Sequence, residues 1–365
     1  MGLTRDELGV AVVGSGRIGT HRARLAAQHP AVRFLALSDI DPARAEALGK
    51  AVGADLVSGD NEEVIARPEV NAVIVSTSEP AHVEPVLQAI ELGKPVLVEK
   101  PIAMTLEDAD RVISAADRKK VDLRVGYIMR YKRRYFMGKE QILEGRLGRI
   151  LGGTGRVYNT RAQAFQILQR SAEATPVIDV LTYWVDMACW FMGKNPPVEV
   201  IARGHGVVFK EAGYPRADDA SWALITFADG AVVSLGVCYA LPEDYPTNGQ
   251  SVRLEILGTD GVLFFDEDHK ENILYTKKGF PHAYVPGQEK KMVFLGSNSS
   301  GDWTLGHMYG PIADETRAWL DHLSTGRICH LATAEDAHRT LEVTLAMEES
   351  ARTGRAVKLP LGEGY

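Results

Sequence analysis

The feature that most constrains the fold is a glycine-rich turn near the start of the chain. An apolar, β-branched run at 9–13 opens directly into Gly14-Ser15-Gly16-Arg17-Ile18-Gly19, and a helix-like segment follows from His21 to Gln28. The glycines allow a tight turn, close approach of backbone N–H groups to a pyrophosphate, and close packing of the helix on the strand. The helix N-terminus adds partial positive charge. The turn therefore predicts a dinucleotide contact at Gly14, Gly16, Arg17, Ile18 and Gly19.

An acidic residue after the next expected strand supports this interpretation. The strand at 32–38 leads into Asp39 and Ile40, and Asp39 lies twenty residues beyond Gly19. A carboxylate at this place accepts hydrogen bonds from the adenosine ribose hydroxyls and repels a 2′-phosphate. We therefore expect NAD rather than NADP, bound near Asp39 and Ile40, although the nearby Arg44 could weaken that preference.

Strands and helices alternate up to residue 127. The expected helices are 42–52, 81–92 and 105–119, and the expected later strands are 72–76, 95–99 and 123–127. This alternation predicts a doubly wound parallel sheet with right-handed crossovers. Ligands bind such sheets at the carboxyl ends of the strands, so Ser76, Thr77 and His82 are candidate cofactor contacts. A histidine at a helix start can equally be structural.

The stretch Pro95-Val96-Leu97-Val98-Glu99-Lys100-Pro101 reads as a buried strand that ends on a carboxylate and an ammonium group. Pro101 lacks an N–H and fixes its own φ, so the strand must stop there. Lys100 is then held on the ligand side of the sheet. A surface charge pair that caps the strand is the alternative interpretation.

Past residue 127 strand-like runs dominate. They lie at 153–158, 198–203, 221–227, 232–239, 252–257, 262–266 and 291–295. Asp229-Gly230 and Asp260-Gly261 indicate hairpins. We predict a Rossmann NAD-binding domain at 1–127 and an α/β domain at 128–365, with one large, open, mostly antiparallel sheet for substrate binding and oligomerisation. Such a sheet often needs a partner on its outer face, which favours a homodimer or homotetramer.

One helix, expected at 178–191, carries a polar stripe. Asp179, Tyr183, Asp186 and Met187 fall on one helical face, while the neighbouring Trp184 is large and apolar. Buried polar groups need partners, and a ligand is one candidate. A core tyrosine bonded to a carbonyl oxygen is the other.

Composition excludes several functions. The 365 residues carry a formal net charge of -7, which argues against nucleic-acid or anionic-membrane partners. The three cysteines are widely spaced and form no metal-ligand pattern, so neither a disulfide framework nor a structural zinc is implied. No apolar run approaches transmembrane length, and we expect a cytoplasmic protein.

Together these residues resemble the glucose–fructose oxidoreductase / inositol dehydrogenase (Gfo/Idh/MocA) family from end to end. The resemblance depends on the Gly14–Gly19 turn, on Glu99-Lys100-Pro101 and on the Asp179-x-x-x-Tyr183 helix, and the segment at 126–131 looks most like the inositol dehydrogenase branch. It implies a Rossmann domain followed by an open-sheet domain that forms dimers or tetramers. It also implies NAD-dependent, reversible oxidation of a secondary hydroxyl on a sugar, an inositol-like polyol or a glycoside.

The sequence departs from the family at Tyr183, where most members have a histidine that acts as general acid and base, although some relatives have tyrosine. Hydride transfer to the nicotinamide requires the hydroxyl proton to leave as well. Tyrosine, with a pKa near ~10, needs a cation beside its phenolate to act as a base. Lys100 is that candidate cation or a direct partner of the reacting oxygen, and Asp179 can orient a neighbouring hydroxyl. Glu99 is expected to fix its loop or touch the ribose.

The predicted catalytic residues are thus Lys100, Tyr183 and Asp179. The predicted substrate contacts are Lys100, Arg130, Tyr158, Asp179 and Tyr183. No metal is required, because the cofactor carries the difficult step. Loops at 158–175, 239–250 and 298–309 are expected to shape the pocket, with Arg161, Gln163, His307 and Tyr309 as further possible contacts.

Three other functions remain open. One is a glycoside-cleaving enzyme that retains NAD and works by oxidation and elimination. Another is a ketoreductase for a nucleotide-linked or aromatic glycoside. The third is a non-enzymatic NAD-binding regulator, which the presence of Lys100 and Tyr183 disfavours.

Overall fold

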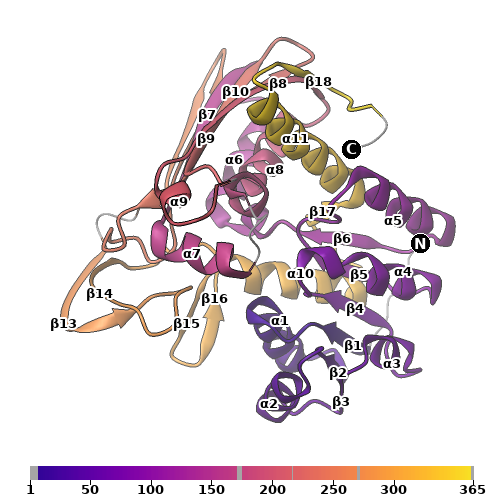
Figure 1. The fold of residues 1–365 in the computed structure, drawn as a ribbon. Coiled ribbons are helices and arrows are strands. Elements are labelled where there is room, and N and C mark those ends of the chain that lie inside the picture. The colour runs from indigo at the N-terminus through magenta and orange to yellow at the C-terminus, as the bar shows by residue number, and fades with distance from the viewer. Residues whose placement is uncertain (1–6, 171–174, 216, 269–271, 363–365) are drawn as a thin grey trace. The chain divides into compact units, whose positions relative to one another are not determined.

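The computed structural model describes residues 7–170, 175–215, 217–268 and 272–362. Their contacts form two compact units, of which the first contains residues 7–132 and 303–341 and the second contains 133–302 and 342–362 (Figure 1). Residues 303–341 pack with the first unit. Residues 171–174 of the loop expected at 158–175 lie outside the described ranges.

The first unit is built on a seven-stranded sheet with the order β17-β6-β5-β4-β1-β2-β3. Its strands are β1 (Leu8–Val13), β2 (Val32–Ser38), β3 (Leu56–Ser58), β4 (Ala72–Val75), β5 (Val96–Glu99), β6 (Leu123–Gly126) and β17 (Ala332–Thr333). β1 to β6 pair in parallel, and only β17 is antiparallel. The order reverses between β1 and β4, which is the switch point where open α/β sheets bind ligands.

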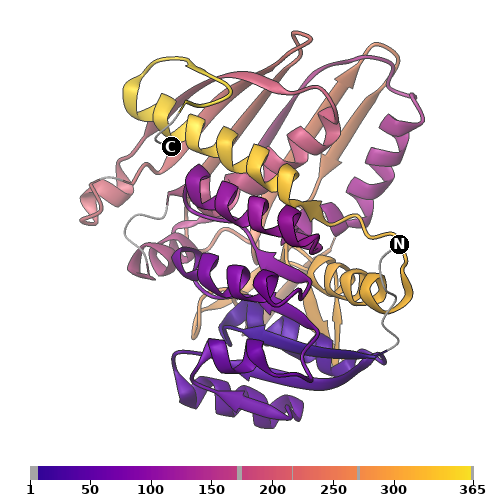
Figure 2. The same ribbon diagram turned by 90° about the vertical axis from the view of Figure 1, so that its right-hand side faces the viewer.

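Helices cover both faces of this sheet. They are α1 (Arg17–Gln28), α2 (Pro42–Val52), α3 (Asn61–Ala66), α4 (Val83–Glu91), α5 (Leu106–Lys119) and α10 (Pro311–Thr325). α1 packs on α10 and α4 packs on α5, and the two pairs lie on opposite faces of the sheet (Figures 1 and 2). Both β1 and β4 are buried along their whole length, as expected of strands covered on both sides. The doubly wound parallel sheet predicted from the alternation is confirmed.

The second unit contains a seven-stranded sheet with the order β12-β11-β7-β10-β9-β8-β18. Its strands are β7 (Ile150–Thr160), β8 (Pro197–His205), β9 (Ala220–Phe227), β10 (Val232–Leu241), β11 (Gln250–Gly258), β12 (Val262–Asp266) and β18 (Val357–Lys358). Only β7 and β10 pair in parallel. β9–β10 and β11–β12 are the two antiparallel hairpins predicted from Asp-Gly turns.

One strand that we predicted from the sequence to lie in the large sheet belongs to a separate, smaller sheet in the structure. The run at 291–295 lies in β14 (Glu289–Phe294), which pairs with β13 (Ile273–Pro281) in a separate two-stranded sheet. Half of the β14 side chains are exposed, including Lys291, so this strand lacks the continuous apolar face that a central strand buries. The neighbouring short hairpin β15 (Asp302–Thr304) and β16 (His307–Tyr309) is also separate.

The large sheet of the second unit has one covered and one open face. The remaining helices are α6 (Arg133–Leu143), α7 (Arg161–Arg170), α8 (Thr182–Met192), α9 (Val208–Glu211) and α11 (Ala334–Thr353). Only residues 342–353 of α11, which is yellow in Figure 2, belong to this unit, and there Ser350 Oγ accepts a hydrogen bond from the Ala202 N–H of β8 at 2.8 Å. Val157, Val237 and Val252 are fully buried on the covered face. Trp222, Leu224 and Phe264 remain 45–67% exposed on the other. Within the described ranges, no helix is long and apolar enough to span a membrane.

Candidate active site

The glycine-rich turn in the first unit has the geometry of a ligand cradle. Gly14 has a φ of 93°, and a Cβ there would lie 2.6 Å from the carbonyl oxygen of Ser76. A Cβ on Gly19 would lie 1.8 Å from the carbonyl oxygen of Gly14, so this residue must be glycine for α1 to pack on the turn. Gly16 has nothing within 4 Å of its Cβ position, which leaves open space beside the N-terminus of α1.

Asp39 fixes the same turn from the end of β2. Its Oδ2 accepts a hydrogen bond from the Ser15 N–H at 2.7 Å, and its Oδ1 accepts one from the Asp41 N–H at 2.9 Å. A carboxylate has about four lone-pair sites, so acceptor capacity remains for ribose hydroxyls. The exposed guanidinium of Arg44 lies 3.5 Å from Oδ1, and Ile40 is 89% exposed beside it.

Two buried hydroxyls at the switch point have no protein partner. They belong to Ser76 and Thr77, directly after β4, and no described residue makes a hydrogen bond to either side-chain oxygen. Buried polar groups are normally satisfied, so an unpartnered pair beside a glycine cradle suits a polar ligand. The cradle, the two hydroxyls and Asp39 together fit a dinucleotide such as NAD.

The segment around Lys100 is anchored on both sides. Glu99 accepts a hydrogen bond from Nε of Arg22 at 2.8 Å. On the other side, Nδ1 of His82 lies 2.8 Å from the carbonyl oxygen of Pro101, and Nε2 lies 3.3 Å from that of Thr77. Burial lowers the pKa of His82 and favours the neutral ring, which has one N–H. The shorter contact assigns that N–H to Nδ1, which donates to the carbonyl oxygen of Pro101. These contacts favour structural roles for Glu99 and His82, while Lys100 itself is half-buried.

Arg130, a predicted substrate contact, is a buried residue of the first unit. It lies in the 3₁₀ turn Ile128–Tyr131, is 2% exposed, and forms an ion pair with Asp336 at 2.8 Å. Both residues belong to the first unit. A buried guanidinium paired with a carboxylate is typical of a structural ion pair, and a substrate contact by Arg130 stays a prediction.

In the second unit, the expected single helix at 178–191 is a π-helical turn, Val177–Leu181, followed by α8. A π turn holds more residues per turn than an α-helix, so the spacing from Asp179 to Tyr183 departs from the regular α-helical repeat. Asp186 and Met187 are fully buried, whereas Asp179 and Tyr183 are half-buried. Asp179 Oδ2 accepts a short hydrogen bond from the hydroxyl of Tyr239, near the end of β10.

Strand alternation separates Tyr158 from this pair. Side chains alternate between the faces of a strand, so Val157 and Asn159 share the covered face and Tyr158 lies on the open one. There the guanidinium of Arg156 lies 4.6 Å from the centre of the Tyr158 ring. Tyr239 follows Val237 on the covered face. Tyr158 and the Asp179–Tyr239 pair therefore lie at different faces of the sheet, and a substrate contact by Tyr158 stays a prediction.

Sequence reasoning missed two buried amides. Asn159 and Gln250 lie directly opposite each other on β7 and β11, at 0% and 6% exposure. Both polar atoms of Asn159 and Oε1 of Gln250 lack partners among the described residues. The hydroxyl of Thr160 and Oε1 of Gln163 are likewise buried without a hydrogen-bond partner among the described residues. The two polar residues Asn159 and Thr160 at the end of β7 were the available signal.

Three of the further residues proposed from the sequence as pocket contacts, Arg161, His307 and Tyr309, lie in different parts of the structure. Arg161 donates a hydrogen bond to the carbonyl oxygen of Ala240 at 3.0 Å, which ties α7 to β10. His307 and Tyr309 are exposed on β16 in the first unit.

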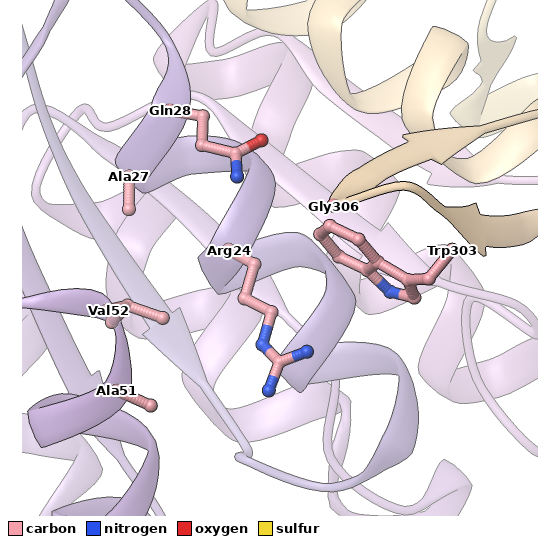
Figure 3. A pocket seen from close by; sticks show the side chains of 7 residues that line it. All are labelled: Arg24, Ala27, Gln28, Ala51, Val52, Trp303 and Gly306. Carbon is pink, nitrogen blue, oxygen red and sulfur yellow. The ribbon is translucent and has the colours of Figure 1, made fainter.

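A separate open hollow of about 460 Å³ lies in the first unit and holds none of the predicted site residues. Figure 3 shows Arg24 and Trp303 projecting into it, with the guanidinium 5.5 Å from the centre of the indole ring. The Trp303 indole donates a hydrogen bond to Nδ1 of His21 at 3.1 Å, and burial lowers the pKa of His21 to about 4. The remaining lining residues are Ala27, Gln28, Ala51, Val52 and Gly306.

The fold and the cradle define an NAD-binding Rossmann protein joined to an α/β domain. Residues 8–127 match the model of an oxidoreductase family's NAD-binding Rossmann fold, and residues 139–359 match the α/β C-terminal domain of the same family. The chain belongs to the Gfo/Idh/MocA oxidoreductase family, as the sequence resemblance implied. It is an NAD-binding oxidoreductase.

Known relatives match almost the whole chain. The NAD(+)-dependent scyllo-inositol 2-dehydrogenase of Bacillus subtilis (strain 168) is 25% identical over 359 residues, which is 97% of each chain. The 2,7-anhydro-N-acetylneuraminate hydratase of Mediterraneibacter gnavus is 23% identical and covers 98% of each chain. The crystal structure of GenD2 from gentamicin A biosynthesis, in complex with NAD, has a TM-score of 0.80 at 25% identity and covers 99% of each chain.

Proposed function

We propose that this oxidoreductase transfers a hydride from a secondary hydroxyl of a neutral, inositol-like polyol or a sugar to NAD. The observation that supports this substrate class best is the set of buried, unpartnered neutral groups of Asn159 and Gln250. Amides both donate and accept hydrogen bonds, which suits hydroxyl groups and provides no charge for an anionic substrate. The inositol dehydrogenase named among the relatives supports the same class.

The cofactor would be held by the Gly14–Gly19 turn, by Asp39 and by the hydroxyls of Ser76 and Thr77. When bound, NAD supplies the hydride acceptor. We assign Lys100 to the reacting oxygen, where its ammonium group stabilises negative charge as the hydroxyl proton leaves. Tyr183 would take that proton as its phenolate, which a nearby ammonium group stabilises, and become the neutral phenol, while Asp179 orients a substrate hydroxyl. Among the other sequence candidates, Glu99 and His82 serve as anchors of the Lys100 segment.

The second candidate is a glycoside-cleaving enzyme that oxidises, eliminates and then reduces with the same cofactor. The 2,7-anhydro-N-acetylneuraminate hydratase among the relatives supports this second candidate. Such an enzyme would retain NAD through purification and would produce no net NADH.

We also propose a homodimer or homotetramer formed through the open sheet face. Trp222, Leu224 and Phe264 expose apolar surface there, which is typical of an association site. Replacement of Trp222 and Leu224 by glutamate should lower the mass measured by light scattering. A cytoplasmic location also remains a proposal, in keeping with the free thiols of Cys189, Cys238 and Cys329.

The test is NADH absorbance with NAD, and separately NADP, across inositols, aldoses, anhydrosugars and glycosides. Steady NADH formation with a neutral polyol supports the dehydrogenase. Lys100→Met should abolish this turnover and leave NAD affinity nearly unchanged, and full turnover in that variant would remove Lys100 from the mechanism. Bound NAD in the purified protein with glycoside cleavage and no net NADH would favour the second candidate.

A further inference from the structure

A fully buried arginine joins three elements of the first unit. Arg22 on α1 donates from Nε to Glu99 at the end of β5, at 2.8 Å. Its Nη2 lies 2.5 Å from Oε2 of Glu315 on α10, and its Nη1 donates to the hydroxyl of Thr316 at 2.7 Å. Arg22 and Glu315 are both 0% exposed, and Glu99 is 8% exposed. None of these contacts belongs to the cofactor cradle.

Gly126, the last residue of β6, has no side chain and so leaves space for Arg22 and Glu99. A Cβ there would lie 3.0 Å from Nη2 of Arg22 and 3.1 Å from Oε2 of Glu99. Any larger residue would press against the ion pair. The network is thus built into the sheet by a residue on the strand next to β5.

The packing of α1 on α10 does not by itself require a buried network of charged side chains. Burying one cation and two carboxylates removes all three from water, and apolar side chains of similar volume often pack as stably. Burial raises the pKa of Glu315 to about 7, and its Oε1 has no partner among the described residues. Glu99, by contrast, directly precedes Lys100 in the chain. Fixing the Glu99 side chain therefore also restrains the backbone of Lys100.

We propose that Arg22 is a positioning residue for Lys100 and acts through Glu99. This inference rests on the proposed function, in which Lys100 contacts the reacting oxygen. Arg22 holds the residue before Lys100, while His82 holds the carbonyl of the residue after it. With both neighbours anchored, the lysine backbone is fixed and only its side chain can move. Positioning of this kind matters because small displacements of a catalytic group lower turnover steeply.

Arg22 also links the lysine to the cofactor cradle. It lies on α1 three residues beyond Gly19, and α1 starts at the glycine turn. The helix that ends the cradle thus carries the side chain that fixes the lysine segment. A purely structural Arg22 would affect folding and NAD binding, whereas a positioning Arg22 affects turnover at saturating NAD and substrate.

The experiment compares Arg22→Met and Arg22→Lys with wild type, with kcat, KM and NAD dissociation constant measured for each. We expect Arg22→Met to lower kcat at least tenfold with the NAD dissociation constant within threefold. Arg22→Lys, which keeps the charge and one contact, should restore part of the loss. The matched control is Arg124→Met on β6, which removes another arginine paired with a carboxylate, Asp122 at 2.8 Å, and should leave kcat unchanged.

A kcat of Arg22→Met within threefold of wild type would overturn the inference, as would a loss of kcat that follows a parallel loss of NAD affinity. If Arg22→Met does not fold, Glu99→Gln decides, because it keeps the side-chain shape and removes the charge held by Arg22. An unchanged kcat in Glu99→Gln then overturns the inference. The two levels remain separable. No NADH formation by the wild-type protein with any polyol or sugar would overturn the proposed function, whereas normal turnover by Lys100→Met would overturn only the role of Lys100 and the inference that rests on it.

Discussion

The hydroxyl of Tyr239 donates a hydrogen bond to the carboxylate of Asp179, across 60 residues of chain. The tyrosine is 1% exposed, so its hydroxyl is fixed, and Asp179 is half-buried at the π-helical turn. A carboxylate held in this way presents its other oxygen in a defined direction. This geometry suits a group that orients one hydroxyl of a polyol.

Tyr239→Phe should therefore weaken substrate use without weakening NAD binding. A hydrogen bond to a charged group contributes about 1.5–3 kcal/mol, so we expect kcat/KM for the polyol to fall roughly 10- to 100-fold. The measurement is steady-state NADH formation at saturating NAD. Tyr131→Phe is the matched control, because its hydroxyl accepts a hydrogen bond from the His330 N–H in the first unit. An unchanged kcat/KM in Tyr239→Phe would show that Asp179 needs no such support.

Asn159→Leu should reduce activity and stabilise the protein at the same time. Removing an unpartnered buried amide relieves its desolvation penalty, so the free energy of unfolding should stay level or rise by about 1 kcal/mol. The KM for the polyol should rise about tenfold if the amide binds a hydroxyl. Asn71→Leu is the control, because Asn71 is bonded to the Gly9 N–H and the Glu7 carbonyl and its loss should only destabilise. An unaltered KM for Asn159→Leu would exclude this residue from the substrate site.

Asp39→Ser should shift cofactor preference towards NADP. The substitution removes the carboxylate that repels a 2′-phosphate and leaves the exposed Arg44 guanidinium available. We expect the ratio of kcat/KM for NAD over NADP to fall about 10- to 100-fold. Asp41→Asn, which keeps an oxygen at the N-cap of α2, should leave the ratio unchanged. A ratio that does not move in Asp39→Ser would mean that another residue selects the cofactor.

Glu315 should make stability fall as pH rises. Its pKa is raised from 4.5 to about 7 by burial, so between these values the folded protein keeps a proton that the unfolded chain releases. Stability then decreases through this window, by up to roughly 3 kcal/mol. Denaturant unfolding at pH 5 and pH 8 should show a steeper loss for wild type than for Glu315→Gln. The exposed Glu46→Gln should behave as wild type, and an equal loss in Glu315→Gln would contradict the assignment.

The local patterns of the sequence were sufficient for the Rossmann half. The spacing of Gly14, Gly16 and Gly19, and the strand that ends at Glu99, depend on residues that are neighbours in the chain, so they can be read directly. The same holds for the hairpins at Asp229-Gly230 and Asp260-Gly261. The limits of the two domains, at 127 and 128, stay a prediction.

Only the tertiary structure decided how distant side chains meet. Arg22 contacts Glu99 and Glu315, which lie 77 and 293 residues away, and no local pattern encodes such a pairing. Strand register placed Tyr158 on one face and Asn159 on the other, and a shift by one residue would exchange them. The sequence by itself therefore determined the class of cofactor and the strand that ends directly before Lys100. The packing of elements far apart in the chain determined which side chains hold Lys100 in place, because burial and register are properties of the whole fold.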